Sequence, residues 1–474
     1  MTLVRPDWVL LQRRLSGELL LPGSDAYEWA RKSFIARFDD IRPQAVAQCA
    51  SVADVAEVVS FARRFGIAIA PRSGGHSLAG YSSTSGIVID VSPLDSVVLA
   101  DGLVTVGAGA RTGQLSQRLF EHRLALPTGT CPSVGIAGLT LGGGIGILGR
   151  AYGLTLDRLV RAQVVLADGA VVDCSDHHHP ELFWALRGAG AGNFGVVTSF
   201  SFHPVTAPTM TNFHLVWSYE DAAAVIDAWQ GWSPCGPDEL SADLVLTAPG
   251  DLSNDIVVEI YGAMIASEDE ASDVLWELVQ RVGVAPHSQR CKQLSYGDTC
   301  AFQAEVSVGY DQVEEDRQHG RRLRQGYRFT KSQFFAQPLP PDAIATLVER
   351  FSDGRREGEA RSVGFAPWAG AYNRRSPRAA AFSHRDQLFS IEHIVVLDPS
   401  APKGAKSAAH EWVTSSWESV STASSAGVYP CFPDPELDDW GRAYYRQNYP
   451  RLVEVKRSYD PANLFHFKQS IPLH

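Results

Sequence analysis

Two glycine-rich stretches each carry one residue that can act as a nucleophile. The first, PRSGGHSLAGYSS at residues 71–83, places His76 directly after two glycines. The second, GTCPSVGIAGLTLGGGIGILGRAYGLTLDRL at residues 129–159, places Cys131 at its head. A neutral imidazole nitrogen and a thiolate are both nucleophiles that can attack electron-poor carbon. Glycines let a backbone pass close to a flat or bulky group, and successive N–H groups can form an anion-binding concavity. Together these stretches predict a ligand held beside two reactive side chains.

Neither stretch has the spacing of a common nucleotide-binding loop. No GxGxxG joins an early strand to a helix with an acidic residue about 20 positions on, and no GxxxxGK[ST] is present. Taken alone, His76 is compatible with a solvated turn, and Cys131 with a small buried apolar side chain. The run of histidines at 177–179 precedes Pro180 and is better explained as a solvated helix entry than as a metal site. No metal is therefore expected.

The segments around these loops alternate between short strands and helices. Residues 51–66 are expected to form a helix that begins at the N-cap Ser51 and ends at Gly66. Thr112 is expected to cap the next helix. Strands are expected at 66–70, 86–91, 103–110 and 195–204, a hairpin at 163–174 and a further helix at 180–188.

After about residue 205 the pattern changes to alternating strands separated by longer helices. Strands are expected at 212–218, 242–248, 255–265, 362–372 and 389–397, and helices at 268–283, 340–351 and 406–420. This pattern is typical of an antiparallel sheet with helices on one side. The sequence thus predicts an α+β protein with one domain over residues 1–205, a second over 206–430 and a C-terminal segment over 431–474.

Composition narrows the class of protein. The 474 residues carry 42 basic and 53 acidic side chains, a net charge of −11, which argues against a nucleic acid or an anionic membrane as the main partner. No signal-peptide-like start and no long apolar run are visible, so a cytoplasmic protein is expected. The seven cysteines are irregularly spaced without a CxxC, which disfavours a disulfide framework or a zinc site. The oligomeric state stays open.

Five motifs in order give the chain a recognisable character: PRSGGHS, VGAGA, GTCPSVGIAGLTLGGGIG, GNFGVVTSF and YDPANLFHFKQSIP. Together they resemble the FAD-linked oxidases of the vanillyl-alcohol-oxidase superfamily, and most closely the berberine-bridge-enzyme-like members. The resemblance covers nearly the whole chain. It implies a discontinuous FAD-binding domain made of residues 1–205 and 431–474, with a substrate-binding domain over 206–430.

The resemblance also implies an FAD held by two covalent bonds, one from His76 to the flavin 8α-methyl carbon and one from Cys131 to flavin C6. Two bonds would fix the ring and raise its redox potential, while the cofactor supplies the chemistry. Further cofactor contacts are implied for the diphosphate, the isoalloxazine and the adenine, and the residues concerned are Arg72, Ser73, Gly74, Gly75, Ser77, Gly135, Gly138, Thr140, Gly142, Gly192, Asn193, Val197 and Asn448.

Oxidation of an alcohol by a flavin needs a base within hydrogen-bond reach of the hydroxyl. By resemblance the base is a tyrosine of a Y-Y-x-x-N motif, so Tyr444 is expected to take this role, with Tyr445 as its competitor and Tyr372 as a second active-site tyrosine. A free tyrosine has a pKa of about 10, so the base needs a lowered pKa or concerted transfer. One departure stands out: relatives often read Y-x-N-F-x-D where this chain has Cys431 in place of the asparagine.

The expected activity is removal of two hydrogens from a secondary alcohol or hemiacetal of a bulky glycosylated, polycyclic or oligosaccharide substrate, with O2 reduced to hydrogen peroxide. An oxidative cyclase or desaturase would use the same flavin on a different bond. A flavin-binding or ligand-binding protein without turnover is the alternative from another class. The substrate and the physiological electron acceptor stay open, as does the effect of Cys431.

Overall fold

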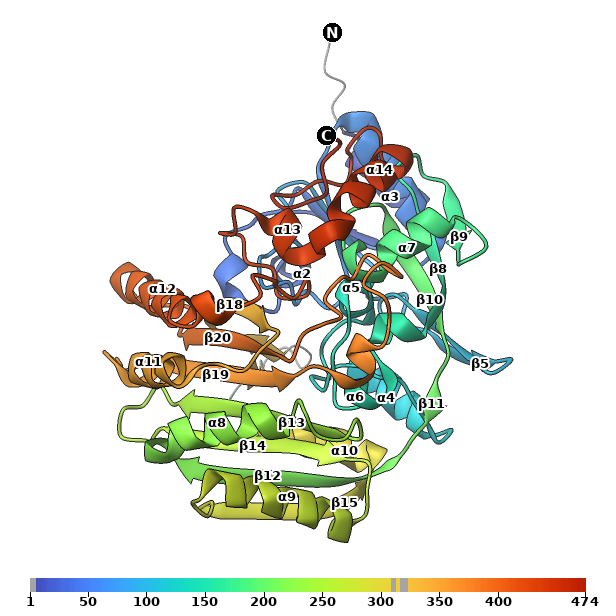
Figure 1. Ribbon diagram of the computed structural model, residues 1–474. Helices are drawn as coiled ribbons and strands as arrows, with labels where there is room; N and C mark the ends of the chain where they lie inside the picture. Colours follow the sequence, from blue (N-terminus) through green and yellow to red (C-terminus); the bar gives the residue numbers. More distant parts are fainter. Residues whose placement is uncertain (1–5, 308–312, 316–322) are drawn as a thin grey trace.

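Two small sheets built by the first two hundred residues carry the glycine-rich loops. They are seen in the upper part of Figure 1, which shows the computed structural model; the structure describes residues 6–307, 313–315 and 323–474. A seven-stranded antiparallel sheet with its helices forms the lower part. The arrangement confirms the predicted α+β class.

The first sheet has the strand order β1-β2-β4-β3. Its strands are β1 (Glu18–Leu20), β2 (Ala45–Gln48), β3 (Ile69–Arg72) and β4 (Ile87–Asp90), of which β2 and β3 run parallel to β4. Helix α3 (Val52–Phe65) starts as predicted, because the Ser51 side chain accepts the Asp54 N–H, and it ends at Gly66 in the left-handed region. Strand β3 then delivers the loop that carries His76.

The second sheet is antiparallel with the order β5-β6-β10-β8-β9. Its strands are β5 (Val97–Ala100), β6 (Leu103–Gly107), β8 (Leu159–Val165), β9 (Val171–Cys174) and β10 (Val196–Phe202). Between β6 and β8 lie helices α4 (Thr112–Phe120), α5 (Ile136–Gly142) and α6 (Gly149–Tyr152), with the short strand β7 (Leu124–Ala125) paired to β11 (Val205–Thr206). The predicted cap at Thr112 is wrong: Arg111 is the N-cap, and the Thr112 hydroxyl instead donates to the Cys131 carbonyl at 2.6 Å.

The large sheet has the order β15-β12-β14-β13-β19-β20-β18. Its strands are β12 (Thr209–Ser218), β13 (Leu240–Ala248), β14 (Val257–Met264), β15 (Ser288–Ser295), β18 (Tyr327–Phe335), β19 (Glu359–Pro367) and β20 (Phe389–Leu397). The polar edge strand β15 was not predicted because its exposed residues show no apolar alternation. The strand predicted at 362–372 ends at Pro367, and residues 370–373 form a short 3-10 turn.

Helices cover one face of this sheet, as predicted. They are α8 (Ala222–Trp232), α9 (Glu268–Val282), α11 (Pro341–Ser352) and α12 (Lys403–Glu418). The core beneath them contains the buried rings of Trp217, Trp229, Phe365 and Phe389. Because side chains alternate across a strand, the opposite face of β18 and β20 points away from these helices and toward the glycine-rich loops. Helix α10 (Tyr296–Val306) lies against β12 and β15.

The C-terminal segment returns to the first two sheets (Figure 1). Helix α13 (Trp440–Tyr445) is followed by α14 (Tyr449–Tyr459), which packs against α7 (Pro180–Ala189). The buried Lys456 ammonium of α14 donates to the carboxylate of Asp460 and to the backbone carbonyl of Asn193. The tail is thereby fixed to the loop before β10.

Two buried arginines join the upper and lower parts. Arg150 of α6 donates to backbone carbonyls that include those of Leu240 and Trp368, at 2.7 and 2.6 Å. Arg385 forms a two-pronged ion pair with Asp157, at 2.7 and 2.8 Å. Within the described residues, no helix is long and apolar enough to cross a membrane, and no group of three or more His, Cys, Asp or Glu side chains is placed to hold a metal.

Candidate active site

A cavity of about 560 Å³ lies where the two glycine-rich loops, the C-terminal segment and strands β18 and β20 meet. This volume is in the range of ligand and cofactor sites. Most of the site residues predicted from the sequence line it, namely Arg72, Ser73, Gly74, Gly75, His76, Ser77, Cys131, Gly135, Gly138, Gly142, Gly192, Asn193, Val197, Tyr444 and Tyr445. His76 and Cys131, which lie 55 positions apart in the sequence, are thus brought to one site.

The two glycine-rich loops touch backbone to backbone. A Cβ on Gly74 would lie 2.3 Å from the backbone nitrogen of Gly135, and a Cβ on Gly135 would lie 2.2 Å from the Ser73 hydroxyl oxygen. No side chain fits at either position. The Arg111 guanidinium ties the loops together by donating to the carbonyl of Gly74 at 3.2 Å and that of Ser133 at 2.5 Å.

His76 enters the cavity as a neutral imidazole. Its ring stacks on Phe34, with ring centres 3.7 Å apart. Burial, with the positive charges of Arg111 and Arg328, lowers the pKa of His76 to about 3. A neutral imidazole keeps a nitrogen lone pair, which a nucleophile needs. His76 and Cys131 line the same cavity, and Cys131 forms no disulfide.

The segment before β10 forms another part of the cavity lining. Gly192 has a φ of +73°, a conformation that favours glycine. The Asn193 side chain donates to the Ala189 carbonyl at 2.8 Å and accepts the Ile471 N–H at 2.9 Å. A cradle of glycines, the buried Arg72 and two nucleophiles fit a large, flat, anionic cofactor such as FAD.

Three predicted site residues do not line the cavity. Thr140 is fully buried within α5. The Asn448 amide donates to the carbonyls of Pro377, Ala380 and Ala381, which fixes that loop. The Tyr372 hydroxyl lies 3.1 Å from both the N–H and the carbonyl of Gly146. The contacts of Asn448 and Tyr372 fix neighbouring loops, and the cofactor or catalytic roles expected for these three residues stay predictions.

The two tyrosines predicted as the base line the cavity, but their hydroxyls are engaged or buried. The Tyr444 hydroxyl accepts the Asp434 N–H at 2.8 Å and lies 3.2 Å from Oε1 of Gln469. Burial raises the pKa of Tyr444 and of Tyr445. A base needs the opposite shift or a concerted transfer, and the catalytic roles of Tyr444 and Tyr445 stay predictions.

Tyr429 is a cavity residue that the sequence analysis did not single out as a base. Its phenolic oxygen accepts the N–H of Gly144 at 2.7 Å and that of Ile145 at 3.3 Å. Burial still raises the pKa of Tyr429, while the Gly144 N–H opposes that rise. The signal lay in the motif that was quoted only for its cysteine, because that motif starts at Tyr429.

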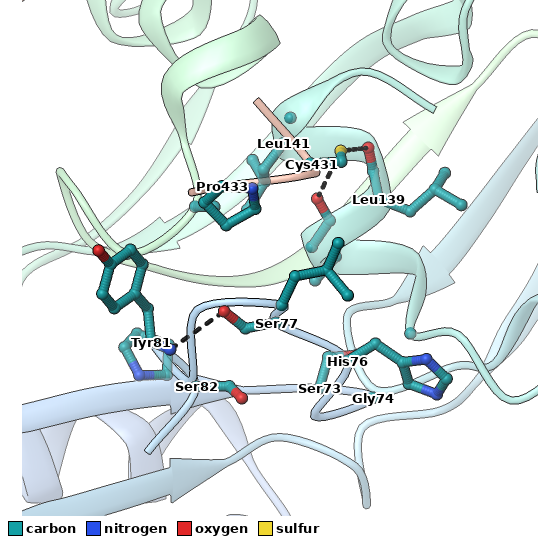
Figure 2. Close-up of a pocket in the computed structure, with 18 of the residues that line it drawn as sticks. Ser73, Gly74, His76, Ser77, Tyr81, Ser82, Leu139, Leu141, Cys431 and Pro433 are labelled. Atoms are coloured by element: carbon teal, nitrogen blue, oxygen red, sulfur yellow. Dashed lines mark hydrogen bonds between the residues drawn. The ribbon is translucent and has the colours of Figure 1, made fainter. Parts of the chain in front are cut away.

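Cys431 lies against helix α5. Its sulfur is 3.7 Å from the Leu139 carbonyl oxygen and 3.9 Å from that of Gly138, the two dashed contacts at the top of Figure 2. A Cβ on Gly142 would lie 2.5 Å from this sulfur. The small thiol therefore fits closely against α5, and burial raises its pKa to about 11.

The wall contributed by the large sheet carries a buried ion pair that sequence reasoning missed. Arg328 of β18 donates to the Glu392 carboxylate of β20 at 2.7 Å and to the Gln325 side-chain oxygen at 3.0 Å. All three residues line the cavity and are at least nine-tenths buried. The available signal was a single acidic residue inside the apolar strand FSIEHIVVL.

Comparisons with known proteins agree with this site. Residues 43–175 match the family described as FAD binding domain, and residues 428–472 match the family described as berberine and berberine like. An uncharacterized FAD-linked oxidoreductase of Bacillus subtilis, YgaK, is 32% identical over 97% of each chain. Chitooligosaccharide oxidase of Gibberella zeae is 31% identical over 90% of this chain and 87% of its own.

One solved relative bears directly on the two nucleophiles. The structure of glucooligosaccharide oxidase from Acremonium strictum, described with a 6-S-cysteinyl, 8 alpha-N1-histidyl FAD, superposes with a TM-score of 0.84 at 25% identity, covering 96% of this chain and 97% of its own. The chain belongs to the FAD-linked oxidoreductases of the berberine-bridge-enzyme-like family. The family and the cofactor FAD, both predicted from the motifs, are confirmed.

Proposed function

We propose that this protein oxidises a secondary alcohol or hemiacetal carbon of a bulky glycosylated, polycyclic or oligosaccharide substrate to a ketone or lactone. The observation that carries the proposal is a single cavity whose one wall is the glycine cradle for FAD and whose other wall is the polar cluster of Gln325, Arg328 and Glu392. Bound FAD supplies a two-electron acceptor at flavin N5, and dioxygen takes up the electrons to give hydrogen peroxide.

We also propose that FAD is attached twice, through His76 and Cys131. Both side chains line the cavity, and His76 is held neutral by its surroundings. The glucooligosaccharide oxidase described with cysteinyl and histidyl bonds supports the same attachment here. A doubly held cofactor leaves the opposite wall free to take a large substrate.

Tyr429 is the proton acceptor in this proposal, in place of Tyr444. Two N–H groups donate to the phenolic oxygen, and that of Gly144 opposes the rise in the pKa of Tyr429 that burial causes. Tyr429 lines the cavity, and because its pKa stays raised, its removal of a proton would be concerted with hydride transfer. The Tyr444 hydroxyl is instead used to fix the turn at Asp434. Removal of the substrate hydroxyl proton by Tyr429 would accompany transfer of the neighbouring C–H hydrogen with its electron pair to flavin N5.

The polar wall gives a reason to expect a substrate rich in hydroxyl groups. A buried carboxylate and amide can accept and donate hydrogen bonds to several hydroxyls, and such groups discriminate strongly against ligands that leave them unpaired. Glu392 and Gln325 are the residues placed to do this, since Arg328 holds both in position.

The test is to mix the yellow holoprotein anaerobically with oligosaccharides, glycosylated polycyclic compounds and alkaloids, and to follow flavin absorbance. Bleaching by a hydroxyl-bearing substrate, peroxide formation on readmission of air and a carbonyl or lactone product support the proposal. A product with a new ring or carbon–carbon double bond contradicts it in favour of a cyclase or desaturase. A panel that never bleaches the flavin favours a binding protein without turnover.

A further inference from the structure

The hydroxyl of Ser133 lies between the two side chains proposed to hold the flavin. Its oxygen is 3.1 Å from Nε2 of His76 and 3.4 Å from the sulfur of Cys131. Ser133 follows Cys131 by two positions but belongs to a different loop from His76. It is absent from the described lining of the cavity, whereas His76 and Cys131 both line it. We therefore expect Ser133 to affect the cofactor through these two neighbours.

The surrounding contacts hold this hydroxyl in place. Arg111 donates to the Ser133 carbonyl at 2.5 Å and to the Gly74 carbonyl at 3.2 Å, so the two loops keep their spacing. The Thr112 hydroxyl donates to the Cys131 carbonyl at 2.6 Å, and the His76 ring is stacked on Phe34. These contacts hold the backbone on both sides of the Ser133 hydroxyl and the ring of His76.

The hydrogen bonds that join His76, Ser133 and Cys131 can run in two directions. Only one of these directions leaves His76 with a free lone pair and also favours the thiolate of Cys131. A neutral imidazole carries one N–H, and the partner of one nitrogen decides which nitrogen keeps the lone pair. If Nε2–H of His76 donates to Ser133, the lone pair is on Nδ1, and the serine hydrogen is free to donate to the Cys131 sulfur. Such a hydrogen bond favours the thiolate, which is the reactive form. In the opposite direction, the nitrogen with the lone pair is the one already bonded to Ser133.

We propose that Ser133 is a positioning residue for flavin attachment, whose hydroxyl accepts the Nε2–H of His76 and donates to the sulfur of Cys131. This inference rests on the proposed double attachment and adds the residue that prepares it. Ser133 selects Nδ1 of His76 as the attacking atom and supports the thiolate of Cys131 through the same oxygen.

The bond balance is the same for each link. One N–H or S–H bond of the protein and one C–H bond of the flavin are replaced by one N–C or S–C bond. The two protons and two electrons released are taken up by one dioxygen molecule, which becomes hydrogen peroxide. The serine hydroxyl is unchanged at the end, so it is neither consumed nor joined to the cofactor.

The test compares Ser133→Thr with Ser133→Val, which have the same shape and differ in the hydroxyl. Ser133→Ala is the third variant, and Ser201→Ala, a serine of β10 outside the described cavity lining, is the matched control. The full chain is produced under riboflavin limitation and mixed with FAD in air. Protein-bound flavin that survives acid precipitation is followed with time, and peptide mass analysis reports each link separately.

Ser133→Thr and Ser201→Ala are expected to form both links at rates close to that of the unaltered protein. Ser133→Val and Ser133→Ala are expected to form both links about tenfold more slowly, the effect of losing one hydrogen bond. Magnetic resonance of the isolated flavin peptide is expected to show Nδ1 of His76 as the joined nitrogen.

Several results would overturn the inference. They are unchanged rates in Ser133→Val and Ser133→Ala, slowing of one link only, slowing in Ser133→Thr as large as in Ser133→Val, or a bond through Nε2 of His76. If the unaltered protein releases all of its FAD on denaturation, the proposed double attachment itself fails. By contrast, attachment of FAD at equal rates in all variants would overturn only the role of Ser133 and would leave the double attachment intact. Should Ser133→Ala fail to fold, the Thr and Val pair still decides.

Discussion

The two walls of the cavity are built in different ways. The cofactor wall consists of loops whose backbones touch, as at Gly74 and Gly135, where no Cβ fits. The substrate wall consists of long side chains on regular strands, with Arg328 and Glu392 paired 2.7 Å apart. A side chain added where two backbones touch forces one of them to move, whereas a side chain on a strand can be exchanged for one of similar size at small cost. We therefore expect the cofactor wall to tolerate fewer substitutions than the substrate wall.

The largest effect is expected at Tyr429, which lines the same cavity as both walls. Tyr429→Phe keeps the ring and removes the oxygen, and we expect turnover to fall by about 10²–10⁴-fold, the usual contribution of a general base. Covalent flavin content should be unchanged. Single-turnover flavin bleaching under anaerobic conditions measures the effect.

Tyr444→Phe is the matched comparison for that variant. It removes the partner of the Asp434 N–H, so we expect lower thermal stability with a much smaller loss of turnover. The reverse pattern, with the large loss of turnover in Tyr444→Phe, would restore Tyr444 as the base and contradict the assignment to Tyr429.

Adding a single methyl group to the cofactor wall should reduce the amount of FAD that the protein holds. Gly135→Ala places a Cβ 2.2 Å from the Ser73 hydroxyl and 2.3 Å from the Gly74 nitrogen, so one loop must shift. Overpacking of this kind costs about 1–3 kcal/mol, so we expect the purified protein to contain less FAD. The ratio of flavin to protein absorbance in the purified protein checks this.

Gly404→Ala serves as the control, because a Cβ at this exposed position of α12 meets nothing within 4 Å. It should keep full flavin content. Normal flavin content in Gly135→Ala would show that the loops are less tightly joined than the backbone contact indicates, and the contrast between the two walls would be lost.

What could be predicted from the sequence follows the same division. His76 and Cys131 were found because each lies in a short continuous motif whose local backbone creates the environment. Tyr429, which we propose as the base, was not chosen over Tyr444, because a motif does not show which way a hydroxyl points once α13 has packed against Gln469. The short apolar strands and the helix at 51–66 were also readable, because their signals are local.

The polar wall could not have been predicted in this way. Arg328 and Glu392 lie 64 positions apart, and they meet through the pairing of β18 with β20. Alternation along a strand tells which residues share a face, but it does not give the register between two strands. Helix α5 was not predicted because its glycines weaken a helix locally. The structure explains one of them, because Cys431 packs against Gly142 where no side chain fits.

A smaller effect is expected on the substrate wall. Glu392→Gln keeps the size and one acceptor oxygen but removes the charge that faces Arg328 and the cavity. Replacing a charged hydrogen bond by a neutral one costs about 1–1.5 kcal/mol, so we expect roughly a tenfold fall in kcat/KM. Flavin content and the two proposed covalent bonds should be unaffected. Loss of FAD from Glu392→Gln would mean that the two walls are not independent.

The smallest expected effect concerns stability in acid. It comes from a residue of the seven-stranded sheet that lies outside the described cavity lining. Burial lowers the pKa of His393 to about 3, and its Nδ1 lies 2.9 Å from the Ser416 hydroxyl, among residues outside the described cavity lining. In the unfolded chain this side chain is protonated below about pH 6.5, whereas in the folded protein it is protonated only below about pH 3. Folding stability from this group is therefore full above pH 6.5 and declines as the pH falls toward 3, by about 1.4 kcal/mol for each pH unit.

Replacing His393 by Gln removes that titration and leaves both cavity walls intact. Urea unfolding at pH 7 and pH 5.5 should show that His393→Gln loses about 1.4 kcal/mol less stability on acidification than the unaltered protein. Its covalent flavin content should be normal. An equal acid sensitivity in both proteins would show that His393 is protonated in the folded state or that water reaches it. A change in flavin attachment would instead show that the seven-stranded sheet and the cofactor wall are coupled. That result would contradict the independence of the two walls.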